Sequence, residues 1–201
     1  MATTHVLFIQ GGGAGAHDED AALAESLKRA LGRGYDVRFP QMPDEADPAV
    51  GSWKQKISAE MSHLHGRVVL VAHSVGGSIL LRYLSEERVS RPIAGLFLLA
   101  APSWDEDHWN FDHLKLAPNI AEKLASIPRI FLYHGRDDDV VPFAHLALHA
   151  ARLPSATVRE LTGGHQFGND LTEVARDIRA KDGAGSTTDD PNLTDKSRSS
   201  N

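Results

Sequence analysis

Residues 67–87 read RVVLVAHSVGGSILLRYLSEE, and their pattern predicts a strand followed directly by a helix. Its first part, Arg67–Ala72, is apolar almost throughout, as a strand is when both faces of its sheet are covered. Its second part, residues 76–87, carries apolar side chains at the three- and four-residue spacing of a helix. A buried strand that runs directly into a helix is the unit from which parallel sheets are built.

The same unit recurs along the chain. We expect further strands at Val6–Ile9, Tyr35–Phe39, Ile93–Leu99, Arg129–Tyr133 and Thr157–Leu161. We expect further helices at Asp18–Leu31, Val50–Leu64, Phe143–Leu153 and Leu171–Ala180. This alternation predicts an α/β protein: a three-layer α/β/α sandwich with a mostly parallel six-stranded sheet and helices on both faces. Ligands of such sheets bind outside the carboxyl ends of the strands, where the chemistry should be sought.

The composition fits one globular domain. The chain has 201 residues, 41% of them hydrophobic, and its 21 Lys and Arg against 27 Asp and Glu give a formal charge of −6. Nucleic acid is an unfavourable partner, since its phosphates need a basic surface. No apolar run approaches the roughly 18 residues of a membrane span, no signal-peptide pattern is present, and cysteine is absent. We therefore expect a cytoplasmic protein without membrane contact or thiol chemistry.

The last stretch of the chain differs from the rest. Residues 183–201 read GAGSTTDDPNLTDKSRSSN and contain a single large apolar residue, Leu193. Such a segment cannot bury enough surface to offset the entropy lost on ordering. We expect one folded domain over residues 1–182 and a disordered C-terminal tail over residues 183–201.

A serine lies among small residues at the turn of the opening stretch. Residues 72–76, AHSVG, fit the pattern small-x-Ser-x-Gly between a strand and a helix. A sharp turn there lifts the Ser74 hydroxyl above the sheet edge, beside a helix N-terminus that favours a developing negative charge. Larger residues at Ala72 or Gly76 would collide with the neighbouring strand and helix. The pattern alone also fits a tight turn with an incidental serine.

An acid and a histidine follow two later strands. Asp137, Asp138 and Asp139 come after the strand at 129–133, and the residues alone leave open which of them would orient a histidine. His165 follows two glycines after the last strand. Because the carboxyl ends of parallel strands share one sheet edge, Ser74, one aspartate and His165 should meet there. The conjunction indicates a single nucleophilic site more strongly than any of its parts.

A glycine-rich turn, residues 11–13, follows the first strand. Its backbone N–H groups can approach a ligand closely, as an oxyanion hole for acyl transfer requires. The rival interpretation is a dinucleotide fingerprint, but Gly11-x-Gly13-x-x-Ala16 matches it only loosely. No acid ends the second strand to bind a ribose, because Phe39-Pro40-Gln41 stands there. The residues therefore favour the oxyanion hole.

Three motifs together resemble those of the α/β-hydrolase superfamily: AHSVGG at 72–77, HGRDDDVVPF at 134–143 and GGHQF at 163–167. The resemblance covers about residues 5–180. The chain is similar to the compact, nearly lidless serine hydrolases, such as the retinoblastoma-binding serine hydrolase group. One departure is Gln10, which stands where the first glycine-rich loop of the family usually has histidine.

The resemblance implies the α/β-hydrolase fold and a catalytic triad. Ser74 is then the nucleophile, His165 the base and Asp138 the acid, when the acid loop is aligned on its glycine and proline. The N–H groups of Gly12 and Val75 are implied as the oxyanion donors. The implied activity is hydrolysis of small carboxylic esters through an acyl-enzyme, with a small-molecule acyl substrate and no metal or organic cofactor.

The segment after the fourth strand, residues 100–111, is the candidate cap over such a site. Trp104, Trp109 and Phe111 are candidates for lining an acyl pocket, and packing over the sheet edge is an equal alternative. A short cap favours small acyl groups over long lipids. His145 and His149 are spaced for one helix face, and we interpret them as solvated histidines rather than as a metal site.

Two other functional classes remain open. A protein with an intact triad can serve mainly as an interaction module with little turnover. An acyltransferase, aminopeptidase or thioesterase would use the same triad, because the acyl-enzyme is common to all of them. The sequence gives no indication of the oligomeric state.

Overall fold

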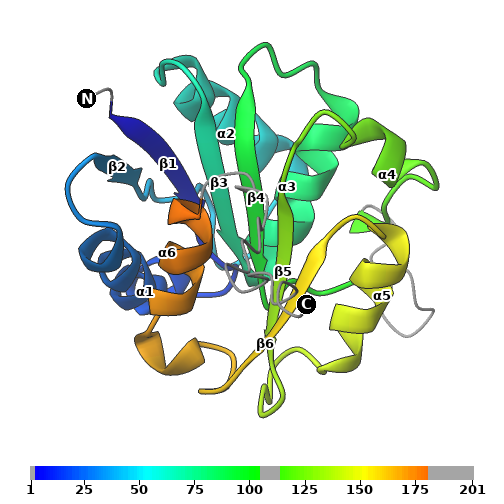
Figure 1. Cartoon of the computed structure of the whole chain (residues 1–201). Coiled ribbons are helices and arrows are strands. Elements are labelled where there is room, and N and C mark those ends of the chain that lie inside the picture. The colour runs from blue at the N-terminus through cyan, green and yellow to red at the C-terminus, as the bar shows by residue number, and fades with distance from the viewer. Residues whose placement is uncertain (1–2, 105–113, 181–201) are drawn as a thin grey trace, which may run out of the picture.

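The computed structural model of the chain describes residues 3–104 and 114–180. Within these ranges the structure is one parallel sheet with helices packed against both of its faces (Figure 1). The predicted tail at 183–201, and with it the end of the predicted domain at residue 182, lies outside the described residues.

The sheet has six strands, and every pair of neighbouring strands is parallel. Its order is β2-β1-β3-β4-β5-β6. The strands are β1 (Thr4–Ile9), β2 (Tyr35–Arg38), β3 (Val68–His73), β4 (Ile93–Leu99), β5 (Ile130–Gly135) and β6 (Thr157–Leu161). All six expected strands are therefore present, and their carboxyl ends meet at the lower edge of the sheet in Figure 1.

The apolar runs are continuous because both faces of the central strands are buried. Along β1, Val6 and Phe8 belong to the core on one face, and Leu7 and Ile9 belong to the core on the other. All four side chains are inaccessible to solvent. The period-2 alternation of a strand thus supplies two cores at once.

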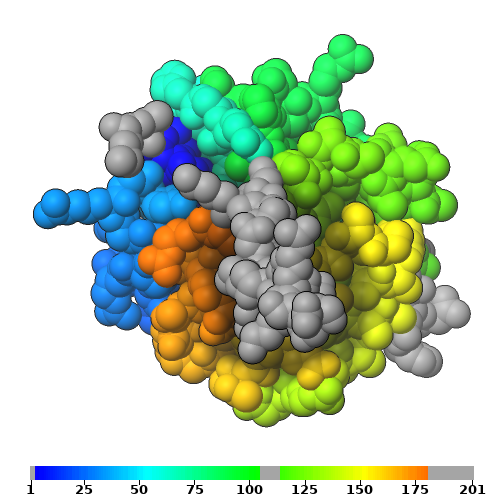
Figure 2. Space-filling model, in the orientation of Figure 1, coloured from blue at the N-terminus to red at the C-terminus, as the bar shows by residue number. Residues whose placement is uncertain are grey.

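Two helices cover one face, α1 (Ala16–Leu31) and α6 (Thr172–Arg179). They lie against each other on the molecular surface, blue beside orange in Figure 2. The other face is covered by α2 (Val50–Ser62), α3 (Ser74–Glu86), α4 (Ile120–Lys123) and α5 (Ala144–Arg152). None of these described helices combines the length and the apolarity needed to cross a bilayer. The three-layer arrangement expected from the sequence is confirmed.

Candidate active site

The site lies where the strand order changes direction. Strand β1 pairs with β2 on one side and with β3 on the other, so the chain departs from the ends of β1 and β3 in different directions. Crevices at such switch points are the usual binding sites of parallel sheets. Gly11 follows β1 and Ser74 follows β3, which brings the glycine-rich loop and the serine turn together. A Cβ placed on Gly11 would be 3.2 Å from the Cβ of Ser74.

Ser74 is the first residue of α3 and has a backbone φ of 50°. This left-handed conformation is costly for a residue with a side chain, on the order of 1–3 kcal/mol, and persists where the surroundings enforce it. The surroundings are tight, since a Cβ on Gly76 would lie 2.0 Å from the Gln10 carbonyl oxygen. Ala72 is fully buried. The turn therefore needs the small residues that the sequence places around the serine.

The loops after β5 and β6 bring His165 to Asp138. Nδ1 of His165 is 2.9 Å from Oδ2 of Asp138. The other carboxylate oxygen, Oδ1, accepts the backbone N–H groups of Val140 and Val141 at 2.9 and 2.8 Å. Nε2 of His134 lies 3.2 Å from Oδ2 and 2.9 Å from the Val141 carbonyl oxygen, to which it donates. The Asp138 side chain is buried and points at His165 with little freedom.

The electrostatics of this pair suit a base that is neutral near pH 7. Burial raises the pKa of Asp138, but the hydrogen bonds from His165, Val141 and Val140 outweigh it and hold the pKa below its usual value. For His165, burial and the neighbouring His73 lower the pKa and exceed the opposing effect of Asp138. An ionised aspartate beside an unprotonated imidazole is the arrangement that a general base requires.

Asp137 and Asp139 are placed differently from Asp138. Oδ2 of Asp137 is 3.2 Å from the backbone N–H of Gly163, at the start of the histidine loop. Both residues are exposed, whereas the Asp138 side chain is inaccessible to solvent. Of the three adjacent aspartates, the one that contacts His165 is therefore Asp138.

Gly12 and Val75 are in direct contact across the crevice. A Cβ on Gly12 would lie 2.5 Å from Cγ1 of Val75 and 2.6 Å from Cγ of Pro48. The N–H groups on either side are engaged, that of Gly11 by Asp20 at 2.7 Å and that of Gly13 by the Glu45 carbonyl at 2.6 Å. Among the described residues, nothing accepts a hydrogen bond from the N–H of Gly12.

The glycine-rich loop is held by two residues that the sequence did not single out for this role. Gln10 is fully buried, its Oε1 accepts the Met42 N–H at 2.9 Å, and its Nε2 donates to Glu45 at 2.6 Å. The Glu45 carboxylate also accepts the N–H groups of Gly15 and His17 at 3.1 and 2.9 Å. Hydrogen bonds from Gln10 and His17 thereby lower the pKa of Glu45. The departure from the family pattern at Gln10 thus ties the loop to residues 42–45.

A second buried carboxylate lies below the histidine loop. Asp20 accepts hydrogen bonds from Gly11 N–H at 2.7 Å, from Nδ1 of His73 at 2.9 Å and from Nε2 of Gln166 at 3.0 Å. Nε2 of His73 is 3.0 Å from the main-chain oxygen of His165. Asp20 shares the buried side of α1 with Leu23 and other apolar residues, so a polar residue at a core position was the available signal.

The remaining candidates differ in outcome. Trp104 is buried in the core, whereas Trp109 and Phe111 lie outside the described residues. The expectation of solvated histidines on α5 is wrong: His145 and His149 are each 3% exposed, because that side of the helix packs against the sheet. Nδ1 of His145 accepts the backbone N–H of residue 103 at 2.8 Å. In the described parts of the chain, no three His, Asp or Glu side chains gather as a metal site would need.

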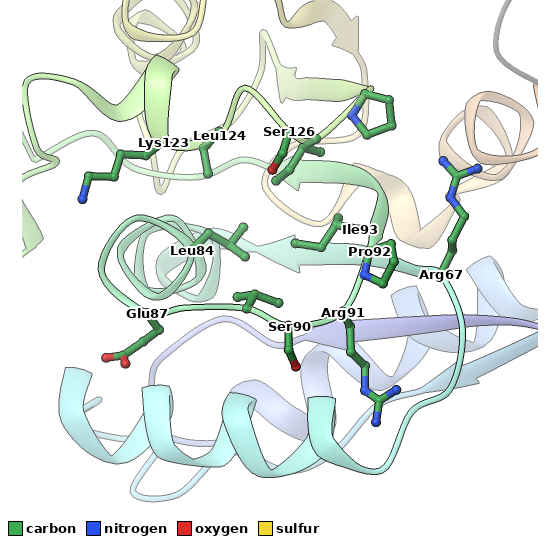
Figure 3. Close-up of a pocket in the computed structure, with 13 residues that line it drawn as sticks. Arg67, Leu84, Glu87, Ser90, Arg91, Pro92, Ile93, Lys123, Leu124 and Ser126 are labelled. Atoms are coloured by element: carbon green, nitrogen blue, oxygen red, sulfur yellow. The ribbon is translucent and has the colours of Figure 1, made fainter.

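A cavity of about 610 Å³ lies at the opposite edge of the sheet (Figure 3). Its lining comes from the segments that lead into β3, β4 and β5 and from the ends of α3 and α4, and it includes Arg67, Arg91, Ile93 and Lys123. Arg91 donates to the main-chain oxygens of the last turn of α2. The cavity is therefore remote from Ser74, which follows the carboxyl end of β3.

Comparisons with known proteins show the family to which the chain is related. A model of the serine hydrolase family matches residues 20–169. The protein YdeN of Bacillus subtilis (strain 168) is 26% identical over an alignment of 147 positions, and the match covers 69% of this chain and 74% of YdeN.

Solved structures resemble the chain over most of its length. The crystal structure of the ydeN gene product from B. subtilis matches with a TM-score of 0.69 and 21% identity, covering 89% of this chain and 98% of that one. A serine hydrolase involved in carbazole degradation, the CarC enzyme, matches with a TM-score of 0.66 and 16% identity, covering 88% and 89%. At these identities the likeness shows the fold that the sequence predicts.

Proposed function

We propose that this chain, which belongs to the serine hydrolase family and has the α/β-hydrolase fold, is a carboxylesterase. It would cleave small esters through Ser74, His165 and Asp138. The observation that carries the proposal is the 2.9 Å contact between Nδ1 of His165 and the buried Asp138 carboxylate. The ring of His165 also lies 4.6 Å, centroid to centroid, from that of His73, the residue that precedes the strained serine.

In the proposed reaction, the Ser74 hydroxyl attacks the ester carbonyl while Nε2 of His165 takes its proton. Asp138 holds Nδ1–H and so fixes the tautomer in which Nε2 is free to accept. The negative oxygen of the tetrahedral intermediate is bound by the N–H groups of Gly12 and Val75, at the N-terminus of α3. His165 returns the proton to the leaving alcohol. Water then attacks the acyl-enzyme while His165 takes its proton, and His165 returns that proton to the Ser74 oxygen as the carboxylic acid leaves.

The substrate class follows from the space around the oxyanion donors. Gly12 is bounded by Val75 and by the ring of Pro48, which leaves no room for a side chain at this position. Trp104, the described aromatic residue of the cap segment, packs into the core. Both features support short acyl groups over long lipid chains. Hydrolysis of p-nitrophenyl acetate should exceed that of the octanoate, and activity that rises steeply with acyl length would contradict the substrate class.

A fluorophosphonate probe tests the nucleophile directly. We expect labelling of the native protein and none of Ser74→Ala. The Asp138→Asn variant should lose about 10³- to 10⁴-fold in kcat, because the wrong imidazole tautomer is then stabilised. Its matched control is Asp139→Asn, which changes the adjacent exposed aspartate and should retain activity.

If the folded native protein were not labelled by the fluorophosphonate probe, the proposed enzymatic activity would be rejected and an interaction module favoured. A panel of esters, thioesters and aminoacyl amides separates the esterase from enzymes that use the same acyl-enzyme.

A further inference from the structure

A buried pair of ionisable side chains, Asp20 and His73, lies directly beneath His165. Each of the two residues is 1% exposed. Nδ1 of His73 is 2.9 Å from Oδ2 of Asp20, and Nε2 is 3.0 Å from the main-chain carbonyl oxygen of His165. Both ring nitrogens of His73 therefore face oxygen atoms.

The hydrogen-bond inventory decides the protonation of this imidazole. A carbonyl oxygen can only accept, and so can an ionised carboxylate, whereas a neutral imidazole has one N–H to give. Both carboxylate oxygens of Asp20 accept N–H groups besides His73, Oδ2 that of Gly11 and Oδ1 that of Gln166. Burial raises the pKa of Asp20, but the hydrogen bond and charge of His73, followed by these two bonds, outweigh it and hold the pKa below its usual value. Asp20 is accordingly the acceptor, and His73 satisfies its two neighbours only when both of its nitrogens carry protons.

A buried ion pair persists when its charges are fully compensated. Asp20 meets this condition, since Oδ2 accepts from Gly11 and His73 and Oδ1 accepts from Gln166. These partners come from the loop after β1, from the last residue of β3 and from the loop after β6. The pair thus joins the loop of the proposed oxyanion hole, the serine turn and the histidine loop at one point.

We propose that His73 is an imidazolium, held in that state by Asp20, and that it acts as a positioning residue for His165. It fixes the main-chain carbonyl of His165 by a hydrogen bond and places a positive charge 4.6 Å from the His165 ring. The inference rests on the proposed function, in which His165 must be neutral to take the proton of Ser74.

The charges around His165 come from three elements. Asp138 faces it from the loop after β5, His73 from the end of β3, and Asp20 from α1. His134 lies behind Asp138, at 3.2 Å from its carboxylate. Burial and the charge of His73 lower the pKa of His165, and the two carboxylates raise it by less. The imidazolium therefore keeps more of His165 in the basic form, and its removal should raise the pKa.

NMR of the native protein tests the protonation state without any catalysis. In a long-range ¹H–¹⁵N spectrum near pH 7.5, we expect both ring nitrogens of His73 to show the shifts of a protonated imidazolium. The signals of the His73 ring are identified as those that are missing from the spectrum of His73→Gln. The Asp20→Asn variant should lose one of the two protons, whereas Asp18→Asn, an exposed acid on the same helix, should leave the spectrum unchanged. A His73 with one protonated nitrogen in the native protein overturns the proposal.

The pH profile of ester hydrolysis tests the positioning role. In Asp20→Asn, and in the double variant Asp20→Asn/His73→Gln that leaves no unpaired buried charge, the acid limb of kcat/KM should move to higher pH. The value of kcat/KM at pH 7 should fall by about 10- to 100-fold, the range expected for a misplaced catalytic group. An unmoved acid limb in a folded variant overturns the proposal. If Ser74→Ala retained activity, the proposed function would fail even with the NMR signature intact, so the two failures are distinguishable.

Discussion

Replacing Gly76 by alanine should separate the two halves of the proposed oxyanion hole. Gly76 lies in the first turn of α3, and a Cβ there would be 2.0 Å from the main-chain carbonyl oxygen of Gln10. Real Cβ atoms essentially never approach such an atom more closely than 3.0 Å. The obstacle is backbone, which cannot swing aside as the end of a side chain can. The start of α3 and the end of β1 must therefore move apart by about 1 Å.

The expected loss of rate follows from the positions of the two proposed oxyanion donors in these segments. Val75 precedes Gly76, and Gly12 comes two residues after Gln10, so a shift of about 1 Å changes the distance between the proposed donors by a similar amount. Hydrogen bonds to an oxyanion are useful only over a few tenths of an ångström, and displacement on this scale costs about 100-fold in rate. The overpacking should also lower the free energy of unfolding by about 1–3 kcal/mol.

The assay compares Gly76→Ala with Gly51→Ala, which lies in the first turn of α2 with open space around a Cβ. We expect the control to keep the native rate of fluorophosphonate labelling and to be slightly stabilised, by up to about 1 kcal/mol, through better helix propensity. Gly76→Ala should lose both rate and stability. A Gly76→Ala protein with native labelling rate and native melting temperature would refute the close contact between the serine turn and the β1 loop.

Three further predictions concern the pH profile, the glycine-rich loop and the fold around it. Because burial and the neighbouring His73 lower the pKa of His165, the acid limb of kcat/KM should have its midpoint below the ordinary histidine value of about 6.5, as a pH–rate series would show. Glu45→Ala should slow ester hydrolysis about tenfold, because the N–H groups of Gly15 and His17 lose their acceptor. This loss is smaller than the roughly 100-fold loss for a missing oxyanion donor. A native rate would show that Glu45 does not hold the glycine-rich loop in its active position. Trp53→Phe should lower the free energy of unfolding in urea by about 1–3 kcal/mol, because the fully buried indole donates to the Pro43 carbonyl at 2.7 Å; an unchanged midpoint would show that this bond does not hold residues 43–48 in place.

The fold was predictable because its strands leave a strong signal. The central strands, which are covered on both faces, read as nearly continuous apolar runs, whereas the edge strands β2 and β6 mix polar and apolar residues; all six expected strands form in the structure. The helix at Ile120–Lys123 was not predicted, because four residues are too few to show a helical period. Helix α3 begins at Ser74, two residues earlier than expected, since the serine turn is itself the first turn of the helix.

The candidate site was predictable in part, and the rest depended on distant partners. Ser74 and His165 could be found because each follows a strand, and strand ends share an edge. Asp138 could be separated from its two neighbours only through a family resemblance, because the turn that aims its side chain is set by backbone contacts at residues 140 and 141. The role of Gln10 depends on residues 32 and 35 positions away, and local patterns carry no information about such pairs.

Asp20, Glu45 and Asp138 share a task that explains why acidic residues lie in these loops. The loops at the sheet edge have few regular backbone partners, and each of these carboxylates accepts two or more hydrogen bonds from them. Hydrogen bonds to an ionised acceptor are stronger than neutral ones, so the carboxylates replace the hydrogen-bond ladder that a strand would supply.

The pKa values of these three carboxylates lie below the ordinary ones. The stabilisation is therefore complete above the unfolded-state pKa, near 4, and is lost as the pH falls through the lower folded-state values. The loops of the site depend on these charges, whereas the central sheet is held by its ladders and two apolar cores, so acid should loosen the site before it unfolds the sheet.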